Sequence, residues 1–173
     1  AAYARTEEIN LSELEPLAAA PHSPDRVVTV ASLSGLPVQQ VLIGSCTNSS
    51  YRDLRIAAEI LRGRKVHPSV SFGVAPGSRQ VLAMIAADGT LRELVEAGAR
   101  ILESACGFCI GNSLSPPTGA VSLRTINRNF EGRSGTPSAR VYLVSPPIAA
   151  LAAFRGQVTD PSAVPEVVYP EVT

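Results

Sequence analysis

The 173-residue sequence has no excess of charge of either sign, because 15 Lys and Arg residues face 15 Asp and Glu residues. A basic excess is the usual mark of proteins that bind nucleic acids or anionic membranes, so we expect neither partner. No apolar run approaches the roughly 20 residues that a membrane-spanning helix needs. No signal peptide is visible at the N-terminus, and we therefore expect a cytoplasmic location.

Cysteine is scarce, and its number is odd: the chain has only Cys46, Cys106 and Cys109. Three cysteines cannot all pair with one another, so a disulfide framework is not expected, whereas a C-x-x-C pair indicates redox chemistry or metal binding. An initial Met is also missing. The chain starts with Ala1-Ala2-Tyr3, which suggests an internal piece of a longer protein.

From Val38 onward, β-branched apolar runs alternate with stretches of helical periodicity. This alternation predicts an α/β domain of three layers, with a mostly parallel sheet covered by helices on both faces. The expected strands are 38–43, 70–75, 99–104, 120–126 and 140–144, and the expected helices are 50–61, a stretch after Ser78, 90–97 and 148–154.

The first part of the chain differs from the rest. Residues 1–37 contain four prolines, which interrupt any long helix. We therefore predict an extended interdomain arm over 1–37, the α/β domain over 38–161, and a tail over 162–173 that leads onward.

The residues suited to chemistry follow three of the expected strands, in the segments Gly44–Asn48, Cys106–Asn112 and Asn127–Arg133. Ligands of open α/β sheets collect at the carboxyl ends of the strands, so these segments are expected on one rim. Cys46 alone is typical of a small buried apolar residue at a strand end. The glycine and hydroxyl groups around it instead suit hydrogen bonding to a sulfur-rich centre.

Three chemistries compete for Cys106 and Cys109. A thioredoxin-like pair begins a long helix, whereas the Gly- and Pro-containing stretch after Cys109 is a poor helix. A zinc site needs four ligands, and His22 and His67 lie in ordinary polar loops. A cluster held by three thiolates fits the number of cysteines, and it leaves one iron without a protein ligand.

Arg128 and Arg133 lie in the polar segment Asn127–Arg133. Two solvated arginines in a loop would be ordinary. Guanidinium groups also bind carboxylates through paired charge-assisted hydrogen bonds, so the segment is a candidate carboxylate clamp.

Taken together, the three motifs resemble the aconitase superfamily, in the order in which that family has them. They read Gly44-Ser45-Cys46-Thr47-Asn48-Ser49, Cys106-Gly107-x-Cys109-Ile110-Gly111 and Asn127-Arg128-Asn129-Phe130-x-Gly132-Arg133. The resemblance covers roughly residues 6–161 and implies the fold of the family's cluster-bearing third domain.

The resemblance implies that Cys46, Cys106 and Cys109 bind a 4Fe–4S cluster. It also implies that Arg128 and Arg133 bind substrate carboxylates, with Asn127 near the cluster. The family's catalytic base is a serine on a separate domain, and no match to that motif is present, so no catalytic residue is expected here. The implied partners are a tricarboxylate substrate and the remaining domains of the same enzyme.

The features that separate the subfamilies point in two directions. The segments Ser49–Leu54 and Pro116–Gly119 are similar to bacterial aconitate hydratases, which interconvert citrate and isocitrate through cis-aconitate. Glu131–Gly135 is shared with isopropylmalate isomerases, and Phe108 stands where aconitases commonly have Pro. The large subunit of isopropylmalate isomerase or homoaconitase is thus the alternative, and a redox or RNA-binding module is a more distant one.

Overall fold

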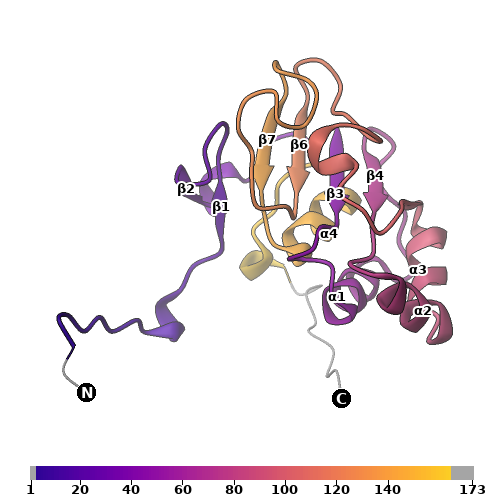
Figure 1. Ribbon diagram of the computed structural model, residues 1–173, viewed down its shortest axis with the longest axis horizontal. Coiled ribbons are helices and arrows are strands. Elements are labelled where there is room, and N and C mark those ends of the chain that lie inside the picture. The colour runs from indigo at the N-terminus through magenta and orange to yellow at the C-terminus, as the bar shows by residue number, and fades with distance from the viewer. Residues whose placement is uncertain (1–2, 165–173) are drawn as a thin grey trace.

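In the computed structural model, which describes residues 3–164, the core of the chain is one mixed seven-stranded sheet with strand order β2-β1-β7-β6-β3-β4-β5 (Figure 1). Strands β7, β6, β3, β4 and β5 are parallel, and β1 runs antiparallel to both β2 and β7. The predicted α/β fold with a mostly parallel sheet is therefore confirmed. The strands are β1 (Leu17–Ala19), β2 (Val27–Thr29), β3 (Gln40–Ile43), β4 (Ser71–Val74), β5 (Arg100–Ile101), β6 (Val121–Arg124) and β7 (Arg140–Leu143).

The helices begin where the sequence supplies capping groups. Ser50 and Asp53 form a reciprocal capping box at the start of α1, and the Ser78 hydroxyl accepts the N–H of Val81 at the start of α2. The α-helices are α1 (Tyr51–Leu61), α2 (Arg79–Ala87), α3 (Thr90–Ala97) and α4 (Pro146–Arg155). Short 3-10 helices lie at η1 (Leu11–Glu13), η2 (Ala31–Leu33), η3 (Phe108–Ile110) and η4 (Pro161–Ala163).

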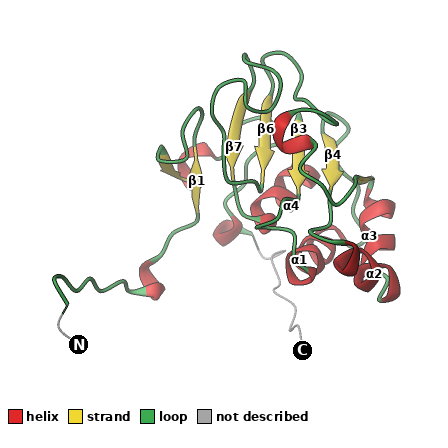
Figure 2. Ribbon diagram, in the orientation of Figure 1, coloured by secondary structure: helices red, strands yellow, loops and turns green. Residues whose placement is uncertain are grey.

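The two faces of the sheet are covered differently. Val41 and Ile43 of β3 belong to the main core with residues of α1 and α4, whereas Leu42 packs with Phe108 of η3 on the opposite face. Figure 2 shows α1–α3 gathered at one end of the sheet, α4 against the strands, and long loops around the remaining edges. The second face thus receives a single 3-10 turn and its loops where the sequence led us to expect helices.

The connections explain this difference. The chain passes from β3 to β4 and β5 in one direction, and then returns across the sheet to β6 on the other side of β3. Right-handed crossovers in opposite directions lie on opposite faces, so the connection from β5 to β6 must cover the second face. The reversal also makes the carboxyl ends of β3 and β6 the switch point of the sheet, where ligands collect.

The N-terminal part adds two strands that the sequence did not reveal. The hairpin of β1 and β2 joins the sheet through the pairing of Ala19 with Leu143 of β7. Residues 3–16 leave the hairpin and run away from the sheet (Figure 1). Large apolar side chains on this stretch are exposed, including Tyr3, Ile9 and Leu14.

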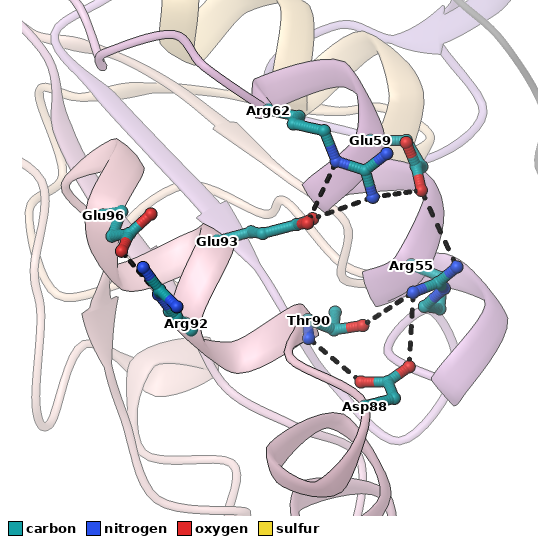
Figure 3. A network of polar contacts seen from close by, with 8 residues as sticks. All are labelled: Arg55, Glu59, Arg62, Asp88, Thr90, Arg92, Glu93 and Glu96. Carbon is teal, nitrogen blue, oxygen red and sulfur yellow. Dashed lines mark hydrogen bonds and ion pairs between the residues drawn. The ribbon is translucent and has the colours of Figure 1, made fainter.

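A network of charged side chains joins α1 to α3 (Figure 3). Arg62 bonds Glu93 at 2.9 Å and Glu59 at 2.6 Å, and Arg55 lies 3.4 Å from Asp88. Exposed ion pairs each contribute only about 0–1 kcal/mol, so the helix pair depends mainly on its buried residues, such as Leu54 and Leu94. Within the part of the chain that the structure describes, no helix is long and apolar enough to span a membrane.

Candidate functional site

The three segments singled out from the sequence follow β3, β5 and β6, and all three strands run parallel. Gly44–Asn48 follows β3, Cys106–Asn112 comes after β5, and Asn127–Arg133 comes after β6. The parallel sheet therefore carries them to one edge, as expected.

Hydrogen bonds of Thr125 link the end of β3 to the end of β6. Its buried hydroxyl accepts the N–H of Gly44 at 2.9 Å and donates to the Gly44 carbonyl at 2.9 Å. The Thr125 carbonyl accepts the side-chain amide of Asn48 at 2.8 Å. These hydrogen bonds fix the position of the Cys46 loop relative to β6, the strand that leads to Asn127.

Ser45 adopts a left-handed backbone conformation with φ of 105°, which is rare for a residue other than glycine. Its hydroxyl accepts the backbone N–H groups of Thr47 at 3.1 Å and Asn48 at 3.3 Å. Strained backbone of this kind persists where surrounding bonds enforce it, and it is common at functional sites. The strain lies directly before Cys46 and turns the chain sharply at the end of β3.

The cysteines fall into a linked group. Cys46 and Cys106 line one small pocket of about 60 Å³, together with Ser45, Ser104 and Pro76. Cys106 in turn lies close enough to Cys109 to raise the pKa of the Cys109 thiol. Cys46 and Cys106 are exposed, Cys109 is buried, and all three are free thiols.

The Cys109 thiol has a strongly perturbed acidity. Burial first, and then the neighbouring Cys106, raise its pKa to about 11, while the charges of Arg124 and Arg133 act in the opposite direction. Despite these two cations, the Cys109 thiol is protonated at neutral pH in the metal-free chain. Binding a metal would therefore release a proton from Cys109 at neutral pH.

This acidity predicts an order of reactivity. At pH 8 we expect iodoacetamide to modify Cys109 at least about tenfold more slowly than Cys46, because alkylation needs the thiolate and access. The rate at Cys109 should keep rising until the pH reaches about 11. Peptide mass spectrometry of the metal-free chain over time measures each site. Equal rates at Cys46 and Cys109 at pH 8 would contradict the buried placement.

The donor set fits a cluster better than a single ion. In residues 3–164 no group of three His, Cys, Asp or Glu side chains lies close enough to hold one metal ion. An iron–sulfur cluster makes a different demand, because each thiolate binds a different iron. Here two cysteines line one pocket and a third lies beside them, so the thiols for such a cluster are close together. Two nearby arginines supply compensating positive charge.

Of the predicted substrate residues, Arg133 is half-buried and acts on Cys109, whereas Arg128 and Asn127 are exposed. Among the described residues, neither arginine forms an ion pair. Both guanidinium groups are thus available to a ligand, and Arg133 is the one that lies beside the cysteines.

Asn129, in the middle of the same segment, turns inward. Its side-chain amide donates to the carbonyl oxygens of Ala20 at 2.9 Å and Val141 at 3.1 Å. It is fully buried, and its Oδ1 atom has no partner within the described residues. Asn129 therefore anchors the arginine segment both to β7 and to the N-terminal hairpin.

The cysteine loop and the arginine segment touch at two glycines. A Cβ atom at Gly111 would overlap the backbone carbonyl of Ser134, and one at Gly135 would overlap the Ser115 hydroxyl. Both glycines have positive φ, 74° and 102°. Thr136 adds a hydrogen bond of 2.6 Å to the Pro116 carbonyl, so the two loops pack as one unit.

Gly111→Ala tests this contact, and Gly63→Ala is its matched control. Gly63 has a similar φ of 69° but nothing within 4 Å of an added Cβ. We expect Gly63→Ala to cost about 1 kcal/mol of unfolding free energy through backbone strain alone. Gly111→Ala should cost roughly 3 kcal/mol, because the Ser134 backbone must also move. Urea unfolding of both variants measures the difference, and equal costs would show that the loops do not press on each other.

Sequence reasoning missed Arg124, Thr125 and Asn129. Thr125 and Asn129 lie close to Asn127 and Arg128 in the sequence. Their residue types alone, however, do not show whether the side chain is buried and bonded to backbone or exposed to solvent. Arg124 ends a strand in which every residue is buried, and a fully buried arginine is rare. The position of this charged residue at the end of a predicted strand was the signal that the sequence offered.

Comparisons with known proteins show the family to which the chain belongs. The model of the aconitase family (aconitate hydratase) matches residues 1–156. The homoaconitase large subunit of Thermus thermophilus is 48% identical over 167 residues, which are 96% of this chain and 40% of that protein. The 3-isopropylmalate dehydratase large subunit 1 of Deinococcus radiodurans is 48% identical over 170 residues, or 96% of this chain and 39% of that protein. The 3-isopropylmalate dehydratase large subunit of Moorella thermoacetica is 41% identical over 165 residues, or 95% of this chain and 39% of that protein. The chain spans about two-fifths of the length of these relatives.

Proposed function

Since this chain belongs to the aconitase family, we propose that it is the cluster-binding part of a hydro-lyase that removes water from a 2-hydroxy acid and returns it at the neighbouring carbon. The observation that carries this proposal is the linked group of Cys46, Cys106 and Cys109 with Arg133 beside it. A 4Fe–4S cluster bound to these thiols would supply a Lewis-acidic iron with an open position for the substrate's hydroxyl.

The residues of this chain then bind and orient the substrate. Arg128 and Arg133 would hold carboxylates through paired hydrogen bonds, which fix both the position and the plane of each carboxylate. Asn127, exposed three residues after the end of β6, can donate or accept a hydrogen bond near the same place. Ser45 and Thr125 keep the Cys46 loop in position by binding its backbone.

For the substrate, we propose an isopropylmalate- or homoaconitate-type acid ahead of citrate. The motifs at Ser49–Leu54 and Pro116–Gly119 favoured a bacterial aconitate hydratase, but the relatives named above are homoaconitase and 3-isopropylmalate dehydratase large subunits. Their names also support a second subunit as partner. The base that removes the proton would come from outside this chain, so the chain alone should be inactive.

Anaerobic reconstitution tests the proposal. With ferrous iron and sulfide, the chain should acquire about four irons and equal sulfide. Addition of 3-isopropylmalate, homocitrate or citrate to the reduced cluster should then change its electron paramagnetic resonance spectrum, most strongly for the preferred acid. A chain that takes up no iron, or a cluster that responds to none of the three acids, would refute it.

A further inference from the structure

Arg124, the last residue of β6, is fully buried on the sheet face that the cysteine loop covers. It pairs in register with Leu42 of β3, whose side chain packs against Phe108. Side chains alternate along a strand, so Ser122 points to the same face as Arg124. Val121 and Leu123 point into the main core on the other side.

The guanidinium group joins the sheet to the loop. Its Nε atom donates to the Ser122 hydroxyl at 3.0 Å, and Nη2 donates to Oε1 of Gln40 at 2.9 Å. The remaining bonds go to the backbone carbonyls of Phe108 and Leu114, the latter at 3.1 Å. Phe108 precedes Cys109 and Leu114 follows it in the sequence, so Arg124 binds the loop on both sides of this cysteine.

Every one of these acceptors is neutral. Within residues 3–164, Arg124 forms no ion pair with a carboxylate, although a buried charge normally costs several kcal/mol unless it is paired. Burial lowers the pKa of Arg124 to about 10, which still leaves the group cationic at neutral pH. The sheet face below the cysteines therefore carries an uncompensated positive charge in the metal-free chain.

A cluster held by three thiolates would carry a net negative charge, which is opposite in sign to the charge of Arg124. Charges and hydrogen bonds around a cluster tune both its retention and its reduction potential. The Cys109 thiol is close enough for Arg124 to lower its pKa, and Arg124 is bonded to the carbonyl that precedes Cys109. The proposed cluster needs a positive counter-charge, and Arg124 lacks a negative one. The two sites thus lie side by side.

We propose that Arg124 is a positioning residue that holds the loop Cys106–Leu114 in place before metal binds, and that its buried charge balances the negative cluster. The charge part rests on the proposed function, whereas the positioning part concerns the metal-free chain. The two parts need different properties of the side chain. Positioning needs the planar fork with its several donors, and charge balance needs only the cation.

Two substitutions separate these properties. Arg124→Lys keeps the cation but cannot reach all four acceptors, whereas Arg124→Met keeps the approximate volume and loses both properties. Arg55→Met is the matched control, since Arg55 also bonds several partners but lies in the network between α1 and α3.

Hydrogen exchange of the metal-free chain tests positioning. Backbone amides of residues 107–114 should exchange at least about tenfold faster in both Arg124 variants, because local opening of the loop becomes easier. Amides of β3 and β4 should change less, and Arg55→Met should leave residues 107–114 unchanged. Unaltered loop exchange in Arg124→Lys would overturn the positioning role, even if Arg124→Met failed to fold.

The reduction potential of the reconstituted cluster tests the charge. Loss of a nearby cation disfavours the more negative reduced state, so the potential should fall in Arg124→Met and stay near the wild-type value in Arg124→Lys. Equal potentials in wild type and Arg124→Met would overturn the charge role. If the wild-type chain takes up no iron at all, the charge role falls with the proposed function, while the exchange data still decide the positioning role.

Discussion

Replacing Cys106 with alanine is expected to leave this chain unable to retain iron after anaerobic reconstitution. Cys46 and Cys109 alone would hold a cubane by two of its irons, and the pocket that Cys106 shares with Cys46 would lose one of its two thiols. Iron and acid-labile sulfide should fall from about four per chain to near zero. Any activity of the proposed hydro-lyase should disappear with them.

Cys106 suits this experiment better than Cys109 because it is exposed, so its removal leaves no cavity in the core. Cys109→Ala would confound metal loss with a packing defect, since Cys109 packs with Phe108 in the second core cluster. Ser113→Ala, an exposed hydroxyl on the same loop, is the control. The assignment of Cys106 as a ligand is wrong if the alanine variant binds as much iron as this control.

The second large effect concerns the arginines. In the hydro-lyase proposed above, Arg128→Lys and Arg133→Lys should each lose roughly 2–4 kcal/mol of transition-state binding, which corresponds to about 30- to 1,000-fold in kcat/KM. Lysine keeps the charge but cannot grip a carboxylate through two parallel bonds. Iron content should stay normal, because neither arginine supplies a thiolate.

Steady-state kinetics beside iron analysis measures both properties in the same samples. Arg140→Lys is the matched control, because Arg140 is exposed at the start of β7 and thus at the amino end of the strand, away from the cysteines. Near-normal kcat/KM in both lysine variants would mean that the segment Asn127–Arg133 is only a solvated loop. A loss of iron in Arg133→Lys would indicate instead that this residue supports the cysteines.

The sequence predicted those parts of the fold in which local signals and burial agree. Each of the five parallel strands lies within one of the ranges expected from the sequence, and Ser50 and Ser78 cap the first two α-helices. The candidate residues could also be found from the sequence, because cysteines and arginines directly after strands meet at one edge of a parallel sheet.

What the sequence did not reveal depends on long-range contacts. Each strand of the N-terminal hairpin has only three residues, and its pairing with β7 joins positions that are more than a hundred residues apart. Proline near a short run argues against a strand on local grounds alone. Likewise, the burial of Arg124 could not be predicted locally, because its acceptors Phe108 and Leu114 belong to the loop after β5. The role of Arg124 is clear only once that loop packs on the sheet.

The close contact at Gly111 and Gly135 has a thermodynamic consequence. One of these residues belongs to the loop that carries two cysteines, and the other follows the segment that carries both arginines. If metal binding orders the first loop, it stiffens the second and strengthens its hold on a carboxylate. Linkage is reciprocal, so a bound carboxylate must then strengthen the hold on the metal by the same factor. Substrate would in that way protect the cluster from loss, without touching any of the three sulfur atoms.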